Sequence, residues 1–365
     1  MVWYNDRLGN DDVWARRVAR DGTSAGPAFY ISVGSGAERS YPNVAYNPQR
    51  NEYLVVWEQQ DSHGFSVHGQ RVSDTGNLIG VEIVFASNPS ATTNYLQPAV
   101  AYATTEDRYL LVFRHDNLSV SWQTIVAVSL AGNAGSPAWT SVVDWDTRDL
   151  PEKPDIAYNR SRNECLVVWQ QKKTGGSGDF DVYARRVAMT GAATPVGSAL
   201  PIATASSDEI NPAVAAVPTV PDAGNYLIAW KVGGDIHMQP VDGDGTQHTS
   251  RVLANTAWTE HSVAIAGNEA RQQFLAVWVW IPVIRPPPMM QVYGRAVTLA
   301  GTSLGTAAVE IDGGQVYEAA VAAGDAGDYL GAFDDNEVIG TSNRGIYGRL
   351  WGTRVYLPLT LRNRP

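Results

Sequence analysis

The sequence has little of several features that define common protein classes. A single cysteine, Cys165, excludes an internal disulfide and any zinc site built from several cysteines. No run of about 18 apolar residues occurs, so no membrane-spanning helix is predicted. Lysine and arginine total 27 against 37 aspartate and glutamate residues, giving a net charge of −10. This shortage of positive charge disfavours nucleic acid and anionic membranes, so we predict neither nucleic acid binding nor membrane insertion.

The N-terminus shows no secretory leader. Met1 is followed at once by Val2 and Trp3, which belong to the middle of a sequence repeat. We therefore expect the native chain to begin further upstream, with a leader that precedes this sequence.

The chain is rich in the residues of short strands and tight turns. Its 365 residues are 44% hydrophobic and 18% charged, which indicates a folded globular protein. It has 34 glycines and 20 prolines, which suit many strands joined by turns, and 12 tryptophans. Most of the tryptophans follow from an internal repeat.

The repeat combines a Pro-x-Val-Ala-Tyr stretch with an apolar stretch that ends in an aromatic residue. The clearest pairs are 42–47 with 53–57, 98–102 with 109–113, and 154–159 with 165–169. The aromatic positions recur every 48 to 61 residues: Trp3, Trp57, Phe113, Trp169, Trp230, Trp278 and Phe333. A third stretch of the Val-Tyr-Ala-Arg-Arg-Val type and a glycine turn with a short apolar segment complete each unit.

Four short strands per unit, without helical periodicity, predict an all-β fold: a β-propeller of four-stranded blades. We expect one propeller domain over residues 1–354, with repeats near 1–38, 39–95, 96–151, 152–209, 210–259, 260–317 and 318–354. Seven blades are expected, and six with a spare N-terminal segment is the alternative. The remaining segment, 355–365, is predicted to be a closing strand or an export-type tail.

The stretch from Trp3 to Val18 resembles blade repeats of large secreted bacterial surface proteins, whose pattern is W-x-D-x-R-x-G-x-x-D-I-Y-x-x-R-V. The resemblance covers roughly residues 2–350, although later units lose the Asp/Arg/Gly turn. Residues 356–362 are similar to C-terminal tails of exported proteins of filamentous green bacteria. Both resemblances imply a secreted or cell-surface protein.

Two sets of repeated residues are predicted to be structural. The aromatic residues that end the second strands should pack between neighbouring blades. The arginines of the third strands should satisfy backbone carbonyls between blades; these are Arg16, Arg185, Arg295 and Arg349.

Residues that break the repeat are better candidates for function. Loops that join second to third strands and fourth to first strands emerge on one face of a propeller, and this face collects tryptophans and carboxylates. Flat rings flanked by carboxylates suit sugar rings. The predicted ligand-binding residues are Trp122, Trp145, Trp258, Trp280, Asp149, Glu152, Glu209 and Glu260.

Other chemistry has weaker support in the sequence. Calcium is possible, with Asp6, Asp11, Asp334 and Asp335 as weak candidate ligands, but their spacing fits no known calcium loop. No other cofactor is expected. Histidines lack metal-ligand spacing and no G-x-S-x-G motif occurs, so no residue is assigned as catalytic.

Three functions follow from these observations. The main expectation is an extracellular, non-catalytic recognition or assembly module that binds a glycan or a protein on the acidic face. The first alternative is a glycan hydrolase or lyase that uses paired carboxylates on that face. The second is a structural surface or filament protein that self-associates through propeller contacts.

Overall fold

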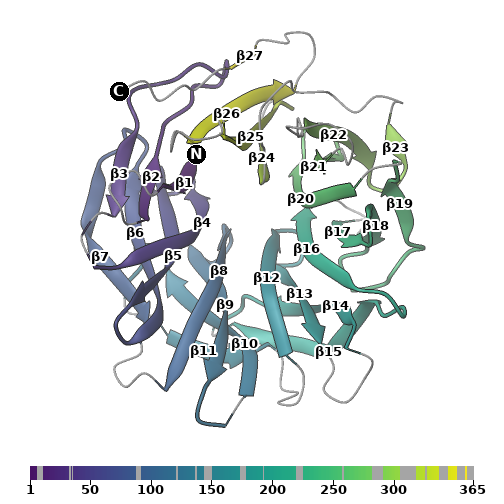
Figure 1. Cartoon of the computed structure of the whole chain (residues 1–365), viewed down its shortest axis with the longest axis horizontal. Helices are drawn as coiled ribbons and strands as arrows, with labels where there is room; N and C mark the ends of the chain where they lie inside the picture. The colour runs from purple at the N-terminus through teal and green to yellow at the C-terminus, as the bar shows by residue number, and fades with distance from the viewer. Residues whose placement is uncertain are drawn as a thin grey trace. The chain divides into compact units, whose positions relative to one another are not determined.

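The computed structural model consists of antiparallel β-sheets (Figure 1). It describes all residues except 6–10, 33, 35, 88–91, 121, 136–137, 144–149, 173–177, 192, 219–224, 257–258, 282–290, 305–317, 325–326, 337–343, 352–357 and 360–365. Within this part of the chain every regular element is a strand, as predicted. Contacts divide the chain into two compact units, residues 1–17 with 25–201 and residues 18–24 with 202–365.

The first unit holds four sheets, whose strands follow one another in chain order. The first sheet has three strands: β1 (Val2–Asn5), β2 (Asp12–Ala15) and β3 (Phe29–Ser32). The second has β4 (Glu38–Asn47), β5 (Glu52–Asp61), β6 (Gly64–Ser73) and β7 (Leu78–Ala86). The third has β8 (Thr93–Ala103), β9 (Arg108–Asn117), β10 (Trp122–Ala131) and β11 (Ala138–Val142). The fourth has β12 (Leu150–Asn159), β13 (Glu164–Lys172), β14 (Phe180–Ala188) and β15 (Thr194–Ala203).

The second unit continues the same pattern in three sheets. The first has β16 (Glu209–Ala216), β17 (Tyr226–Val232), β18 (Asp235–Val241) and β19 (Arg251–Ala254). The second has β20 (Thr259–Asn268), β21 (Gln273–Ile281), β22 (Gln291–Thr298) and β23 (Ser303–Leu304). The third has β24 (Ala319–Ala323), β25 (Tyr329–Asn336), β26 (Arg344–Trp351) and β27 (Pro358–Leu359).

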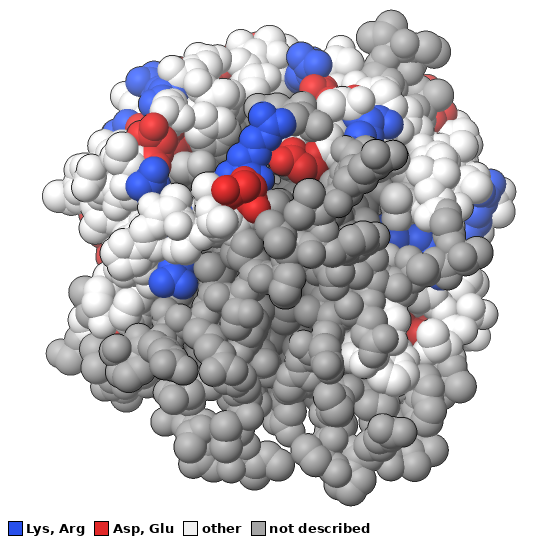
Figure 2. All heavy atoms as spheres, turned by 90° about the horizontal axis from the view of Figure 1, so that it is seen from above, with Lys and Arg blue, Asp and Glu red and all other residues white. Residues whose placement is uncertain are grey.

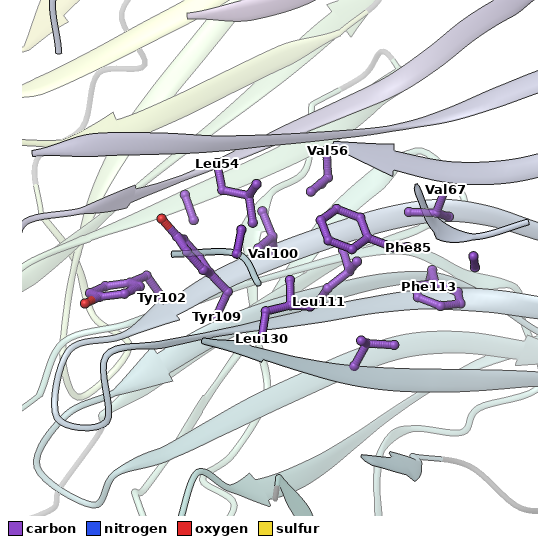
Figure 3. Packing of buried hydrophobic residues seen from close by; sticks show 14 of the residues in the cluster. Leu54, Val56, Val67, Phe85, Val100, Tyr102, Tyr109, Leu111, Phe113 and Leu130 are labelled. Carbon is purple, nitrogen blue, oxygen red and sulfur yellow. The ribbon is translucent and has the colours of Figure 1, made fainter. Parts of the chain in front are cut away.

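The second strands β5, β9 and β21 are apolar on both faces because another sheet of the same unit packs on each side. In β5 the run from Leu54 to Trp57 is almost completely buried. Between the second and third sheets, Leu54, Val56 and Phe85 meet Leu111 and other residues of the third sheet in one core (Figure 3). Consecutive sheets within each unit share cores of this kind.

The repeated residues have the predicted structural roles at the positions where their contacts are described. The aromatic residues are buried at Trp3, Trp57, Phe113, Trp169, Trp230 and Trp278; the side chain at 333 lies outside the described part. Arg185 Nη1 donates to the Val143 carbonyl of the preceding sheet at 2.7 Å. Arg295 Nη1 donates to the Leu253 carbonyl of the preceding sheet at 2.6 Å. These two arginines therefore link neighbouring sheets through backbone carbonyls; for Arg16 and Arg349 the role stays a prediction.

The described part of the C-terminal segment is β27, which pairs with β26 at the edge of the last sheet. Closure of the propeller by this segment, the repeat boundaries and the number of blades all stay predictions. No described segment forms a helix with the length and hydrophobicity needed to cross a bilayer.

Candidate functional site

Polar side chains gather at one end of the sheets in the first unit. Antiparallel pairing places the beginning of each first strand opposite the end of the second strand, so that Ser40 pairs with Glu58. At the equivalent places of the next two sheets Leu96 pairs with Arg114, and Glu152 pairs with Gln170; Asp116, two residues beyond Arg114, pairs with Asn94. The repeat thus brings Glu58, Arg114 and Gln170 of successive sheets to equivalent places at this end.

Arg114 of β9 lies at the centre of these residues. Its Nε is 2.9 Å from Asp116 Oδ1, and its Nη2 donates to Asp116 Oδ2 at 2.9 Å. Its Nη1 donates to Glu152 Oε2, on the first strand of the next sheet, at 3.2 Å. Gln170 Nε2 donates to the other oxygen of Glu152 at 2.8 Å. We call Arg114, Asp116, Glu152, Gln170 and Glu58 the Arg114 cluster.

Two carboxylates that share one guanidinium are necessarily close. The Asp116 and Glu152 oxygens bound to Arg114 are at most roughly 9 Å apart, which does not exceed the upper limit of roughly 9.5 Å between paired carboxyls of glycosidases. Asp116 is 6% exposed. Burial raises its pKa, the positive charge of Arg114 opposes this shift, and the negative charge of Glu152 adds to it. The cluster therefore holds a carboxyl with increased proton affinity beside a second carboxylate.

Glu58 of β5 is the third carboxyl of the cluster. Its Oε1 accepts a hydrogen bond from Ser40 Oγ at 2.8 Å, and its Oε2 accepts one from the Gln97 backbone N–H at 2.8 Å. Burial raises the pKa of Glu58, while these two donors and the charge of Arg114 oppose the shift. Glu58 thus joins its own sheet to the next one and lies within the field of Arg114.

A repeated bulge in the first strands supplies the backbone donors. Tyr41, Gln97 and Lys153 have φ angles of 50°, 54° and 53°, and each lies where the register of its strand pair shifts. The Gln97 N–H points to Glu58, and the Lys153 N–H donates to Gln97 Oε1 at 2.8 Å. Bulges redirect backbone and side-chain groups and are frequent beside active sites. Here they connect three successive sheets at the cluster.

Aromatic rings lie on the third sheet, on the face opposite Arg114 and Asp116, because successive residues of a strand point to opposite faces. Tyr95 stacks on His115 with ring centroids 4.8 Å apart, and His115 meets Trp122 edge-on at 5.3 Å. Burial lowers the pKa of His115, which favours the neutral ring. Trp122, predicted as a ligand-binding residue, is half-buried at the start of β10, opposite Asn117.

The structure separates the predicted ligand-binding residues into two groups. Trp122 and Glu152 lie in the first unit; Glu152 belongs to the Arg114 cluster, and Trp122 lies on β10, on the opposite face of the third sheet from Arg114. Trp280, Glu209 and Glu260 lie in the second unit. Trp280 Nε1 donates to Thr256 Oγ1 at 3.1 Å, and the fully buried Glu260 accepts the Thr256 N–H at 3.0 Å. Glu209 is buried and accepts from Ser207 Oγ at 3.3 Å. Glu209 and Glu260 therefore have local structural partners.

The structure describes only some of the remaining predicted residues. Trp145, Asp149, Trp258 and Asp6 lie outside the described residues. The backbones of Asp334 and Asp335 belong to β25, and the Asp11 carbonyl accepts the Arg39 N–H at 3.0 Å. Among the described residues no group of three or more His, Cys, Asp or Glu side chains is arranged to hold a metal ion.

Charge on the surface is mixed. On the face shown in Figure 2, described Lys and Arg atoms lie beside Asp and Glu atoms in small groups among uncharged residues.

The sequence analysis missed Glu58, Arg114 and Gln170. Each directly follows the repeated aromatic residue of its second strand, where it continues an apolar run with a polar side chain. This change from apolar to polar residues is the sequence signal that could have identified them.

Sequence comparisons add no family. No family model matches the chain, and no curated protein is significantly similar to it.

Solved structures do match the fold. A protein of unknown function from Dyadobacter fermentans is 10% identical, with a TM-score of 0.62, over 87% of this chain and 95% of that one. A Hadza microbial sialidase is 11% identical, with a TM-score of 0.59, over 90% of this chain and 70% of that one. A leech intramolecular trans-sialidase, solved with 2,7-anhydro-Neu5Ac, is 7% identical, with a TM-score of 0.55, over 81% and 65%. With the four-stranded sheets, these matches confirm the predicted β-propeller fold.

The main functional expectation requires correction. The chain was expected to be a non-catalytic recognition or assembly module, but matching structures with named activities are a sialidase and a trans-sialidase. The expectation assumed that the carboxylates are exposed and flank tryptophan rings that bind a sugar. Instead, Glu209 and Glu260 are buried, and Glu152 shares a guanidinium with Asp116. The non-catalytic prediction is therefore wrong, and the glycan hydrolase alternative is better supported.

Proposed function

We propose that the chain hydrolyses glycosidic bonds and that the Arg114 cluster is its catalytic centre. The observation that carries this proposal is the shared guanidinium, which binds two carboxylates while burial raises the pKa of one of them. Glycoside hydrolysis needs such a pair, because one carboxyl protonates the leaving oxygen while the other activates water or attacks the sugar. The fold of the sialidases adds support at the level of architecture.

The two carboxyls have different roles in this proposal. Asp116 is the proton donor, because burial favours its protonated form. Glu152 is the second carboxyl, held in place by hydrogen bonds from Arg114 and Gln170. The Glu152 side chain is 25% exposed, which leaves it within reach of water or a sugar.

The compartment and the wider relationship are further parts of the proposal. We infer a secreted or cell-surface protein of the bacterial repeat-propeller type, supported by the repeat pattern between Trp3 and Val18. A glycan is the proposed ligand, and nucleic acid is disfavoured by the net charge of −10.

The test is release of sugar from a panel of glycans, sialosides included, by the purified chain. Asp116→Asn and Glu152→Gln should each lower the rate by at least about 10²-fold, as expected when an acid–base group is lost. Glu164→Gln is the matched control, because Glu164 also binds an arginine, Arg186, at 2.8 Å but begins β13 at its opposite end. This control should keep its activity. Absence of hydrolysis across the panel, or equal losses in all three variants, would contradict the proposal.

A further inference from the structure

A second polar constellation lies on the second sheet, apart from the Arg114 cluster and independent of the function proposed for it. Ser66 and His68 are two residues apart on β6, so their side chains leave the same face of the strand. Glu82 lies on the neighbouring strand β7. His68 occupies the repeated aromatic position of the third strand, where Tyr183 and Tyr293 also stack on the tryptophan of their second strand. Ser66 and Glu82 lie outside the repeated aromatic and arginine positions.

The three side chains form a continuous chain of hydrogen bonds. Ser66 Oγ is 2.9 Å from His68 Nε2, and His68 Nδ1 is 2.7 Å from Glu82 Oε1. Ser32 Oγ of β3 donates to the other Glu82 oxygen at 2.8 Å. A serine, a base that contacts its hydroxyl and a carboxylate that orients the base are the parts of an activated nucleophile. The arrangement is recognised by geometry and not by the order of residues in the chain.

The surroundings hold the histidine in place. Its ring stacks on Trp57 of β5, with ring centroids 6.1 Å apart. The Trp57 indole N–H is buried and has no hydrogen-bond partner among the described residues. Hydrogen bonds from His68 and Ser32 lower the pKa of Glu82 against the effect of burial, so Glu82 is held as a carboxylate. Ser66 Oγ also donates a hydrogen bond to the Gln59 carbonyl at 3.1 Å, which is longer than its contact with His68.

We propose that Ser66 is a nucleophile activated by His68 and Glu82, and that this site hydrolyses carboxylic esters with a small acyl group. Ser66 Oγ adds to the ester carbonyl while its proton passes to His68 Nε2. The carbon–alkoxide bond then breaks, and the alcohol leaves with that proton. Water, deprotonated by His68, attacks the acyl-serine, releases the carboxylic acid and restores the hydroxyl. Glu82 stays ionised and stabilises the imidazolium through His68 Nδ1–H.

Burial sets the size of the substrate. Ser66 is 6% exposed and His68 is 7% exposed, so only a small acyl group reaches the hydroxyl. Ser66 lies two residues after the start of β6, next to the connection from β5. An acyl group carried on the outside of a larger molecule, such as an acetyl ester, fits this position better than an ester within a polymer backbone.

The experiment uses a small alkyl fluorophosphonate probe on the full chain, followed by peptide mapping. Ser66 displaces fluoride from phosphorus and gains a covalent phosphonyl group, while its proton passes to His68. Ser73 is the internal control, because it lies on the same strand, is more exposed than Ser66 and contacts Thr75 instead of a histidine. We expect labelling at Ser66, none at Ser73, and at least a tenfold slower rate in His68→Gln and Glu82→Gln.

A conservative variant and a second assay test the proposal even if one of the variants does not fold. Glu82→Gln preserves the shape of the side chain, and thermal unfolding of each variant shows whether the sheet is intact. Hydrolysis of 4-nitrophenyl acetate gives a second measurement, which Ser66→Ala should abolish. An unlabelled Ser66 in the folded protein would overturn the proposal. Labelling that Glu82→Gln and His68→Gln leave unchanged would overturn the activation of Ser66 by these residues.

Discussion

Tyr46 and Tyr102 occupy the same position of the repeat but differ in burial. Each hydroxyl donates a 2.7 Å hydrogen bond to the residue five positions later, Asn51 or Asp107. Tyr102 is 7% exposed, because it packs in the core between the second and third sheets, which includes Ala45. Tyr46 is 45% exposed, because it belongs to the second sheet and the sheet before it has three described strands. Substitutions of these two tyrosines therefore separate the effect of burial on stability from the effect of the hydrogen bond.

The difference in exposure predicts a difference in stability. An aromatic side chain buries roughly 200 Å² when fully covered, so Tyr102 buries roughly 80 Å² more than Tyr46. At about 25 cal/mol per Å², Tyr102→Ala should lower the free energy of unfolding by about 2 kcal/mol more than Tyr46→Ala. Urea denaturation followed by tryptophan fluorescence measures this difference, and both residues lie in the first unit. Tyr102→Phe should lose more than Tyr46→Phe, because Tyr102 donates to a carboxylate and Tyr46 donates to an amide. The part due to burial is therefore the loss of each alanine variant beyond that of its phenylalanine variant. Equal losses in the two alanine variants would refute the packing described for the core between these sheets.

Three other predictions concern single side chains. Arg185→Met should lower the free energy of unfolding by about 1–3 kcal/mol, because it leaves the buried Val143 carbonyl without its donor. Arg50→Met, at an exposed ion pair, should lower it by less than about 1 kcal/mol, and urea denaturation measures both losses. Cys165 is fully buried and burial raises its thiol pKa, so a thiol reagent should react only as the protein unfolds; fast reaction in the native state would contradict this burial. The pKa of Glu58 is raised in the folded protein, so its contribution to stability falls as pH rises from the unfolded value of 4.5 through the higher folded value. Glu58→Gln should remove this fall from the curve of unfolding free energy against pH. Parallel curves for the wild type and the variant would contradict the prediction.

The fold was predictable because its signals are local and repeated. Each unit carries a continuous apolar second strand that ends in an aromatic residue, such as Leu54–Trp57, and such a run fits only a strand covered on both faces. The role of Arg185 was predictable for the same reason, because a polar residue that recurs in several sheets needs a recurring partner.

The candidate site was predictable only in part. Glu152 was identified because it breaks the repeat, but its partners Arg114 and Asp116 come from the preceding sheet. That contact depends on the register of two strand pairs and on a bulge at Gln97 with positive φ, which sequence patterns do not specify. The error about function had the same origin. Carboxylates interpreted from their loop positions as an exposed rim proved to be buried and paired with an arginine or local donors.

The dependence of rate on the leaving group tests the central claim most directly. A general acid matters most when the leaving alcohol is a poor one, because an acidic phenol departs without a proton. Aryl and alkyl glycosides of the sugar released from the panel should therefore be compared in the wild type and Asp116→Asn. The account predicts that Asp116→Asn slows alkyl glycosides by at least about 10²-fold and leaves dinitrophenyl glycosides nearly unaffected. An equal effect on both substrates would contradict the assignment of Asp116 as the proton donor, and no turnover of either by the wild type would contradict glycoside hydrolysis itself.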